Sequence, residues 1–461
     1  MRRTYLLISA AFLSLAAMGN AADPAADAKR FWPQWRGPLG TGSAPEAGPP
    51  LTWSDTQHVK WKAAIPGEGD STPIVWGERV FLLTAIPTGK KGEGKPSDAA
   101  AEPRRDPPPP GGPPPGRGMG DGAPNEQWQF VVLCLDRETG KTLWQKTARE
   151  EVPHEGHQPN NTYASASPVT DGQLLLAYFG SRGLHCYDVQ GNLKWSKDFG
   201  RMQTRMGFGE GASPALYGDT VVVYWDDEGD HDFIAALDKR TGKELWRTPR
   251  DEATGWSTPL VIDYQGKPQV VVNATGKVRS YDLATGKEVW SCAGQTANAI
   301  PSPVASGDTV YVTSGFRGSA LYAIALGHTG DLTGTDAIRW HHDKHTPYVP
   351  SPLLTGDLIY VLANNNNLLS CFDARTGAAQ FEAERLEGLR EIYASPVAAK
   401  DRVYVLGRDG TCVVLRKGPK LEVLATNKLT DRTDASMALV GGELFIRGRQ
   451  YLYCIADGAR P

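Results

Sequence analysis

The chain is poor in cysteine and lacks the common catalytic signatures. It has six cysteines among 461 residues, and no two of them are adjacent. No Cys-x-x-Cys-His motif is present, which excludes a covalently attached c-type haem. There is also no Gly-x-Ser-x-Gly elbow, no Walker loop and no dinucleotide fingerprint, so hydrolase, nucleotide-dependent and nicotinamide chemistry lack positive support. We therefore predict no catalytic residues.

Excess charge and long apolar runs are lacking as well. The net charge of -3 argues against a protein that binds nucleic acid through its bulk surface. The apolar run at residues 5–17 is too short to span a bilayer. It follows an Arg-Arg pair and precedes small residues, so residues 1–22 are predicted to be a secretory signal cleaved near Ala21 or Ala22. We expect a periplasmic or secreted monomer, exported by the general route, with the twin-arginine route as the alternative.

What the sequence does contain is a repeated phrase, in which an aspartate precedes Thr-Gly-Lys and an aromatic residue. The clearest copy runs from Asp238 to Trp246, and further copies begin at Asp136, Asp282 and, in a weaker form, Asp373. Each copy lies between two apolar alternating runs. Such a phrase is typical of a β-hairpin, because glycine supplies a positive φ while Asp and Thr bond the turn backbone.

A second phrase, Ser or Thr followed by Pro and apolar residues, alternates with the first. Its copies begin at Thr72, Ser167, Ser213, Thr258, Ser302, Ser351 and Ser395, with Ser436-Met437 as a degenerate eighth. From the second copy to the seventh the spacing is about 45 residues, the period of a β-propeller whose blades have four strands. We label these strands A to D from the centre outward, with Pro at the start of strand A.

The number of outer D strands gives the number of blades. Each is expected to carry an aromatic or apolar anchor, namely Trp61, Trp144, Trp195, Trp246, Trp290, Trp340, Phe381 and the run 421–424. The first strand, residues 59–65, has no A, B and C strands before it, and the last unit has no D strand after it. We therefore predict an all-β, eight-bladed propeller over residues 59–457, in which the N-terminal strand completes the last blade. Residues 23–58 form an N-terminal extension.

Cysteines recur at one position of the repeat. We assign Cys134, Cys186, Cys371, Cys412 and Cys454 to the same place in strand C, where other blades have Ala or Ser. Equivalent positions in adjacent blades lie roughly 10 Å apart, beyond the ~7 Å limit for disulfide-bonded Cα atoms. Buried, unpaired thiols are therefore expected.

A segment rich in proline and glycine interrupts the first blade at residues 87–127. Its composition lacks apolar periodicity and is typical of disordered or polyproline segments. We interpret it as a disordered surface insertion, with partner docking as the alternative.

The repeat phrase carries a family resemblance. The stretch from Ala236 to Trp246 resembles the docking phrase of the quinoprotein-like propeller superfamily. The opening Trp32 to Pro38 and the stretch Asn161 to Phe179 resemble secreted members found in planctomycete-type bacteria. The superfamily includes pyrroloquinoline quinone (PQQ) dehydrogenases and the propeller lipoprotein that assists outer-membrane protein assembly, so the resemblance implies the fold without selecting an activity.

The dehydrogenase alternative implies specific residues. Those enzymes hold the quinone between a Trp and a ring made by two adjacent cysteines, with calcium bound by Glu, Asn and Asp. This chain has no adjacent cysteines, although Trp256 and nearby acidic groups could serve. We therefore predict no firm cofactor, with PQQ and calcium as the alternative, and no metal site.

A ligand site is expected on the face that carries the D-to-A and B-to-C connections. The candidate ligand-binding residues are Asn161, Tyr163, Arg182, Glu210, Asp226, Trp256, Arg317, Tyr393 and Arg408. Arginines in four of the turns suit a carboxylate or sulfate ligand, or they are simply solvated turn residues. Trp144, Trp195, Trp246, Trp290 and Trp340 are interpreted as wedges between blades. His154, His157, His341 and His342 lack the spacing of a zinc site.

These observations favour a binding or scaffolding propeller that holds a protein partner or a small anionic ligand. The competing hypothesis is a PQQ- and calcium-dependent alcohol or sugar dehydrogenase.

Overall fold

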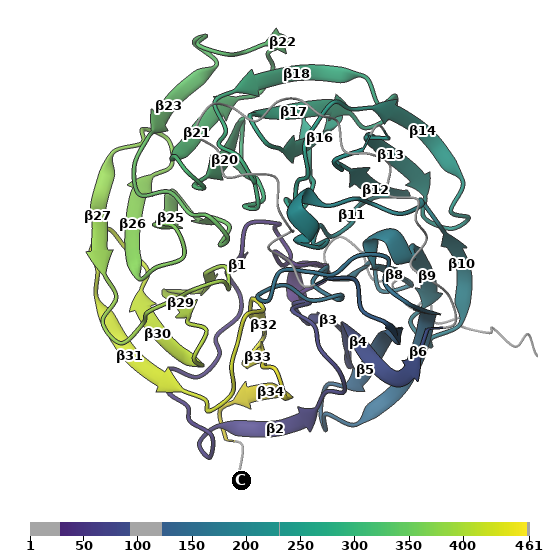
Figure 1. Cartoon of the computed structure of the whole chain (residues 1–461). Coiled ribbons are helices and arrows are strands. Elements are labelled where there is room, and N and C mark those ends of the chain that lie inside the picture. Colours follow the sequence, from purple (N-terminus) through teal and green to yellow (C-terminus); the bar gives the residue numbers. More distant parts are fainter. Residues whose placement is uncertain (1–27, 93–121, 230, 459–461) are drawn as a thin grey trace, which may run out of the picture.

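The computed structural model describes residues 28–92, 122–229 and 231–458. Its strands form eight antiparallel four-stranded sheets arranged as blades around a central axis, and two of these sheets carry an additional short edge strand (Figure 1). Two short 3₁₀ turns occur, η1 (Gly180–Arg182) and η2 (Arg205–Gly207). The eight-bladed all-β propeller predicted from the sequence is thereby confirmed.

The first four blades follow the chain in order, each from strand A to strand D. Blade 1 contains β3 (Ile74–Trp76), β4 (Arg79–Lys91), β5 (Glu126–Asp136) and β6 (Thr142–Glu151). Blade 2 contains β7 (Val169–Thr170), β8 (Leu174–Tyr178), β9 (Leu184–Asp188) and β10 (Leu193–Lys197). Blade 3 contains β11 (Ala215–Tyr217), β12 (Thr220–Trp225), β13 (Phe233–Asp238) and β14 (Glu244–Pro249). Blade 4 contains β15 (Leu260–Tyr264), β16 (Lys267–Asn273), β17 (Lys277–Asp282) and β18 (Glu288–Ala293).

The last four blades complete the ring. Blade 5 contains β19 (Val304–Ser306), β20 (Thr309–Ser314), β21 (Ala320–Ala325) and β23 (Ile338–His342). Blade 6 contains β24 (Leu353–Thr355), β25 (Leu358–Leu362), β26 (Leu368–Asp373) and β27 (Ala379–Arg385). Blade 7 contains β28 (Val397–Ala399), β29 (Arg402–Leu406), β30 (Thr411–Arg416) and β31 (Val423–Lys428). Blade 8 contains β32 (Ala438–Val440), β33 (Glu443–Arg447), β34 (Tyr451–Ala456) and, from the other end of the chain, β2 (Val59–Ala64).

Strand β2 closes the ring. It pairs antiparallel with β34, with Trp61 opposite Cys454, and takes the D position of blade 8 (Figure 1). The closure expected from the incomplete first and last units is therefore confirmed. Because the final blade joins both ends of the chain, its last exposed edge is paired.

The N-terminal extension lies across the strands nearest the axis. The backbone N–H groups of Thr170, Leu354 and Ala398 donate to backbone oxygens of residues 33–42 at 2.9–3.1 Å. These three donors lie on the A strands of blades 2, 6 and 7. The extension then forms β1 (Ser43–Ala44), which pairs parallel with β28. It thus ties together A strands from three blades at the centre of the ring.

One buried arginine secures this extension. Nη2 of Arg36 donates to the backbone oxygens of Pro352 and Pro396 at 2.8 and 3.2 Å. Burial lowers the pKa of Arg36 to about 9. The guanidinium reaches carbonyls on blades 6 and 7, so it links the extension to both.

Tryptophans on the D strands of five blades bind each of these blades to the next. Nε1 of Trp246 donates to the backbone oxygen of Leu283 at 2.8 Å, and its ring lies so close to Gly286 that a Cβ there would overlap it. The same donation to the turn of the next blade occurs for Trp61, Trp144, Trp195 and Trp340. The glycine of the repeat phrase is therefore needed for its positive φ and for this close approach.

Trp290 departs from the pattern expected of it. Its side chain is fully buried, and Nε1 donates to Oε1 of Gln269 in its own blade at 3.2 Å. Blade 5 lacks the Thr-Gly-Lys turn that would receive the indole. Its longer connection instead forms β22 (Gly330–Asp331), which pairs parallel with β18 and covers Trp290.

Both predicted boundaries of the proline- and glycine-rich insertion, residues 87 and 127, are wrong. Strand β4 continues to Lys91 and β5 begins at Glu126, with Pro87 opposite Trp128, so both ends of the segment 87–127 belong to the hairpin. Regular pairing overrides the proline because it lies near the end of the sheet, where a missing donor costs little. The remaining residues 93–121, and the predicted signal at 1–22, lie outside the described residues.

The cysteines occupy the cores of the sheets. All six are buried and none forms a disulfide, as expected. Cys134 and Cys454 lie opposite the anchor tryptophans of their blades, but Cys412 does not share this position. In blade 7 Val414 takes the strand C position opposite the D-strand anchor, and it pairs with Ala425. Strand D of this blade begins at Val423, two residues later than expected.

Candidate functional site

A ring of eight Ser and Thr residues marks the starts of the A strands, and hydrogen bonds join seven of its eight neighbouring pairs. In seven consecutive pairs, the backbone N–H of the Ser or Thr in one blade donates to the hydroxyl of the Ser or Thr in the next blade, at 2.7–3.1 Å. The members are Thr72, Ser167, Ser213, Thr258, Ser302, Ser351, Ser395 and Ser436. Because a buried N–H without an acceptor is costly, the repeated phrase needs a hydroxyl at this position.

Above this ring the structure contains a cavity of ≈ 500 Å³. Its base includes Ser167, Ser213, Ser395 and Ser436 of the ring, together with Trp35 from the N-terminal extension. The D-to-A connections of several blades supply its walls. The cavity therefore lies on the axis of the propeller, on the face where the sequence predicts a site.

Five aromatic side chains line the cavity and remain partly exposed in it. They are Trp35, Phe208, Trp256, Tyr348 and Tyr393. The indole of Trp256 is held by a 2.7 Å hydrogen bond to the backbone oxygen of Gly209. Since apolar surface is normally withdrawn from water, several aromatic rings facing one cavity indicate a binding site.

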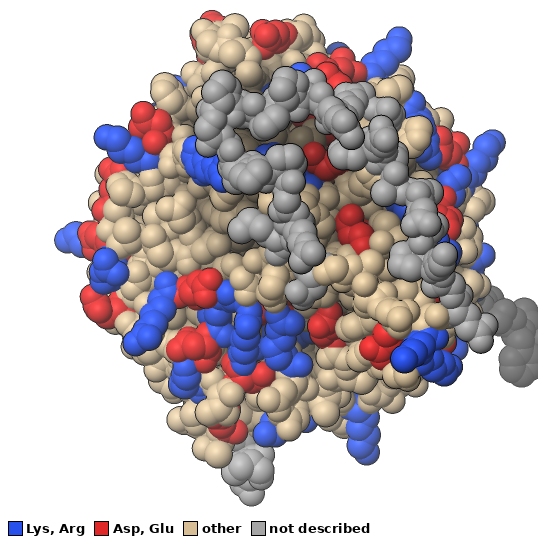
Figure 2. All heavy atoms as spheres, in the orientation of Figure 1, with Lys and Arg blue, Asp and Glu red and all other residues tan. Residues whose placement is uncertain are grey.

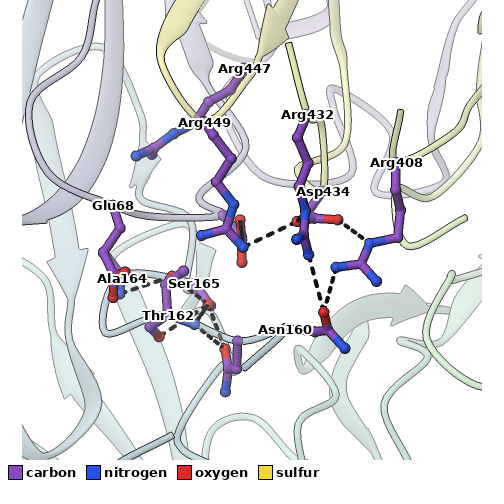
Figure 3. Close-up of polar contacts among 12 residues, drawn as sticks. Glu68, Asn160, Thr162, Ala164, Ser165, Arg408, Arg432, Asp434, Arg447 and Arg449 are labelled. Atoms are coloured by element: carbon purple, nitrogen blue, oxygen red, sulfur yellow. Dashed lines mark hydrogen bonds and ion pairs between the residues drawn. The ribbon is translucent and has the colours of Figure 1, made fainter. Parts of the chain in front are cut away.

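One side of the cavity carries a network of arginines around a buried carboxylate. Asp434 accepts from Arg408 at 2.6 Å, from Arg432 at 3.0 Å and from Arg449 at 3.1 Å. Figure 3 shows the three guanidinium groups converging, with Asn160 accepting from both Arg408 and Arg432. Figure 2 shows basic and acidic side chains crowded together over blades 7 and 8.

The members of this network differ in accessibility. The Arg432 side chain is 45% exposed and that of Arg449 25%, whereas that of Arg408 is 9% exposed. Arg408 also binds Glu391 at 2.9 Å and lies over the ring of Tyr393 at 4.0 Å. Arg432 and Arg449 are thus the members able to reach a ligand at the rim.

A second carboxyl group, Asp70, lines the same side. Its closest basic partner is Arg449, whose Nη2 lies 3.9 Å away. Burial raises the pKa of Asp70 to about 6, and the neighbouring Asp434 adds to the rise while Arg449 opposes it. Asp70 therefore changes charge within the mildly acidic range.

The structure brings only some of the predicted site residues to the cavity. Asn161, Trp256 and Tyr393 line it, and Arg408 reaches it through Asp434. Asn161 holds two connections together, because Nδ2 donates to the backbone oxygens of Phe208 and Glu210.

Three other candidates, Tyr163, Arg182 and Glu210, lie together behind this wall, and Arg182 is buried. Nη1 of Arg182 donates to Glu210 at 3.1 Å, and Ser181 donates to the same carboxylate. The Arg182 guanidinium lies 5.5 Å from the ring of Tyr163. Burial raises the pKa of Glu210, while Arg182 opposes the rise. These side chains support the loops of blades 1 and 2 and do not line the central cavity.

The last two candidates lie apart from the cavity. Asp226 is fully buried in an ion pair with Arg250 at 2.6 Å, and Arg250 also binds the hydroxyl of Tyr281. Arg317 is exposed, and its guanidinium lies over the ring of Phe316 at 5.2 Å. Within the described part of the chain it makes no ion pair.

The histidines also serve packing. His342 stacks on Phe372 at 4.2 Å and contacts the backbone oxygen of Gly377, while His341 packs against Tyr322. Nε2 of His154 lies 2.7 Å from the backbone oxygen of Met202. Over the residues that the structure describes, no group of three or more His, Cys, Asp or Glu side chains is arranged to hold a metal ion.

Sequence reasoning missed several residues of the cavity. Trp35, Asp70, Phe208 and Arg432 line or border it, but none lies in a repeat phrase. Asp70 and Arg432 occupy D-to-A connections just before a Ser or Thr of the ring, and this placement was the available signal. Trp35 depends on the path of the extension across the axis, which no local pattern specifies.

Solved structures with related folds were found. BamB from Moraxella catarrhalis matches with a TM-score of 0.51 and 14% identity over 75% of this chain and 93% of that one. The quinohemoprotein alcohol dehydrogenase ADHIIG from Pseudomonas putida HK5 matches with a TM-score of 0.58 and 12% identity, covering 95% of this chain and 81% of the enzyme. The computationally designed Ika8 protein matches with a TM-score of 0.50 and 17% identity over 74% of this chain and all of that one. At these identities the likeness shows the fold alone.

Sequence comparison gives the family. No curated protein matches the chain. Among the described residues, no helix is both apolar and long enough to traverse a bilayer. A family model described as outer membrane protein assembly factor BamB matches residues 129–382, more than half of the chain. The chain therefore belongs to this BamB-like family of PQQ-like β-propellers.

Proposed function

We propose that this chain is a non-catalytic binding or scaffolding propeller of the bacterial envelope. It holds an acidic ligand, either a small molecule or an acidic segment of a protein partner, over the cavity on its axis. Arg432 and Arg449 receive the anionic group at the rim, while the aromatic side chains contact the rest of the ligand.

The central cavity is the observation that carries this proposal. Partly exposed aromatic rings in a pocket of ≈ 500 Å³, with a few convergent polar groups, are typical of a ligand site. The ring hydroxyls at its base accept backbone N–H groups of neighbouring blades, as Ser436 does from Ser395 at 2.9 Å. Their oxygens therefore help to hold neighbouring blades together, which is a structural role.

Membership of this family supports a protein partner and a location in the periplasm or outside the cell. The matching model bears the name of an outer membrane assembly factor, which favours a protein partner and a location in the periplasm or outside the cell. The predicted signal at residues 1–22 agrees with this location. We propose cleavage near Ala21 or Ala22.

The competing quinone-dependent dehydrogenase fits the cavity poorly. The six cysteines lie buried within the sheets, so none can form a ring against the quinone. Among the described residues, no three acidic side chains of the wall are grouped to hold a metal ion. The residues present therefore do not match this cofactor.

Two acidic probes test the proposal. Tricarballylate and a decapeptide rich in Asp and Glu are titrated into the protein by calorimetry, and each is expected to bind with one-to-one stoichiometry. Arg432→Ala removes an exposed cation at the rim and should weaken both about tenfold. Arg317→Ala removes an exposed cation on the same face but outside the cavity, and should leave both unchanged.

Two outcomes would contradict the proposal. One is equal loss of binding in the Arg317→Ala and Arg432→Ala variants, which would indicate non-specific attraction to surface charge. The other is stoichiometric binding of PQQ with calcium, followed by dye reduction when an alcohol or aldose is added. That second result would establish the dehydrogenase alternative.

A further inference from the structure

The polar groups of the cavity wall include donors as well as acceptors. Oε1 of Gln158 accepts from the backbone N–H of Asn160, and Oδ1 of Asn160 accepts from Arg408 and Arg432. The amide nitrogens of both side chains make no hydrogen bond within the described residues, so each presents donors to the cavity. Both residues line the same stretch of wall.

The same cavity is also lined by an acceptor. The Asp70 carboxylate lines the cavity and makes no hydrogen bond to another described side chain, only the 3.9 Å contact with Arg449. Ser436, which also lines the cavity, accepts a backbone N–H through Oγ, and its own O–H group is still available to donate. The cavity lining therefore contains donors, acceptors and hydroxyl groups that can be either.

A simple anion would use only part of this wall. A carboxylate or sulfate accepts hydrogen bonds only, so it pairs with the donors of a wall and leaves the acceptors unpaired. Here Asp70 and Asp434 both line the cavity. A ligand whose groups both donate and accept satisfies such a wall, and hydroxyl groups have this property.

The aromatic side chains narrow the class further. A pyranose ring has hydroxyl groups at its edge and apolar C–H faces that pack flat on aromatic rings. Trp256 and Tyr348 offer ring surface within the wall, and Trp35 offers it at the base. Aromatic residues suit such a ligand because one side chain combines a large apolar face with a polar tip.

The rim adds a place for a carboxylate. Arg432 and Arg449 lie beside the cavity with side chains 45% and 25% exposed, and Asp434 holds both in position. Their remaining N–H groups can donate to a planar carboxylate. Building on the proposed function, we propose that the ligand is an acidic saccharide, with its sugar ring on the aromatic side chains and its carboxylate on Arg432 and Arg449.

Three probes separate this inference from the proposed function. They are tetragalacturonate, an acidic saccharide; cellotetraose, a neutral one; and tricarballylate, an acid without a sugar. Each is titrated into the full mature chain by calorimetry, with tryptophan fluorescence as a second readout because Trp35 and Trp256 line the cavity. Tetragalacturonate should bind at least about tenfold more tightly than either other probe.

Each variant tests the contribution of one part of the ligand to binding. Trp256→Ala removes a stacking surface and should weaken tetragalacturonate about tenfold while changing tricarballylate little. Gln158→Ala removes a hydrogen-bond donor and should weaken tetragalacturonate by a smaller factor, again with little change for tricarballylate. This residue lies outside the hydrophobic core, so the fold should not be affected. Arg432→Ala should weaken tetragalacturonate and leave cellotetraose unchanged. Arg317→Ala, outside the cavity, is the matched control.

Two results overturn the inference. The first is tricarballylate binding as tightly as tetragalacturonate, with no effect of Trp256→Ala or Gln158→Ala, and it leaves the proposed function intact. The second is cellotetraose binding as tightly as tetragalacturonate, which would also refute the acidic ligand of the proposed function. Failure of all three probes, together with the acidic peptide, would refute both proposals.

Discussion

The backbone N–H of Thr258 donates to the hydroxyl of Ser302 at 2.7 Å, and this bond joins the start of blade 4 to the start of blade 5. The neighbouring hydroxyl of Ser257 is equally buried, yet it has no hydrogen-bond partner among the described residues. These two serines therefore occupy similar surroundings but only one of them joins blades.

The ring hydroxyl should contribute measurably to stability. Ser302→Ala leaves the half-buried N–H of Thr258 without its acceptor, and we expect a loss of about 1–2 kcal/mol in the free energy of unfolding. Ser257→Ala removes a hydroxyl that bonds to nothing and should change stability by less than about 0.5 kcal/mol. Urea unfolding of both variants measures the difference. Equal losses would refute the structural role of the ring.

The contact between Gly286 and Trp246 can be tested in the same way. Gly286→Ala places a Cβ into the indole ring at a φ of 72°, so overlap and backbone strain add, and we expect a loss of about 2–4 kcal/mol. Gly307→Ala has a similar φ of 59° but no atom near its Cβ, so only the strain of about 1 kcal/mol remains. Thermal unfolding compares the two. A larger loss for Gly307→Ala would contradict the docking account.

Two deletions should differ sharply in their effect on stability. Removing the chain through Ile65 takes away β2, β1 and the buried Trp32 and Arg36, which leaves blade 8 with three strands. We expect no cooperative unfolding transition from that protein. Joining Gly92 to Gly122 keeps the paired ends of the β4–β5 hairpin and should change the melting temperature little, because loop length has only a weak entropic effect. Calorimetry of both proteins decides, and similar melting temperatures would refute the closure.

Stability should depend on pH through Glu155. Burial raises the pKa of Glu155 from 4.5 to about 7 in the folded chain. The folded state therefore holds the proton more tightly than the unfolded state, so this group's contribution is fully present below pH 4.5 and is lost as pH rises through about 7. A tenfold difference in proton affinity between the two states corresponds to about 1.4 kcal/mol. The free energy of unfolding of Glu155→Gln should therefore fall by about 1–3 kcal/mol less than that of the unmodified protein as pH rises from 4.5 to about 7. An unchanged pH profile in urea titrations would contradict this.

The fold could be predicted because it depends on local, repeated chemistry. Each Thr-Gly-Lys turn needs its glycine for φ and for contact with a tryptophan, and the Ser or Thr before Pro, except Thr72, accepts a hydrogen bond from the preceding blade. Such requirements recur once per blade, so they leave a period in the sequence. The unmatched strand at residues 59–65 likewise indicated ring closure, which β2 confirms.

The site could be predicted only as a face. Position in a connection does not tell whether a side chain points into the cavity or beneath it, so Arg182 and Asp226 were candidates although both are buried in ion pairs. Trp290 was expected to bind the next blade, but the loop that replaces the repeat phrase in blade 5 covers it instead. Residues such as Trp35 enter the cavity through long-range chain path, which has no local signature.

The most direct test of the central claim is to fill the cavity and measure binding. Because all six native cysteines are buried, a single introduced thiol can be modified selectively. Ile300 lines the cavity, whereas Val423 is 51% exposed on the outer strand β31. After reaction with a bulky maleimide, the Ile300→Cys protein should lose binding of tetragalacturonate and tricarballylate, and the Val423→Cys protein should retain it. Undiminished binding by the modified Ile300→Cys protein would show that the ligand site lies elsewhere.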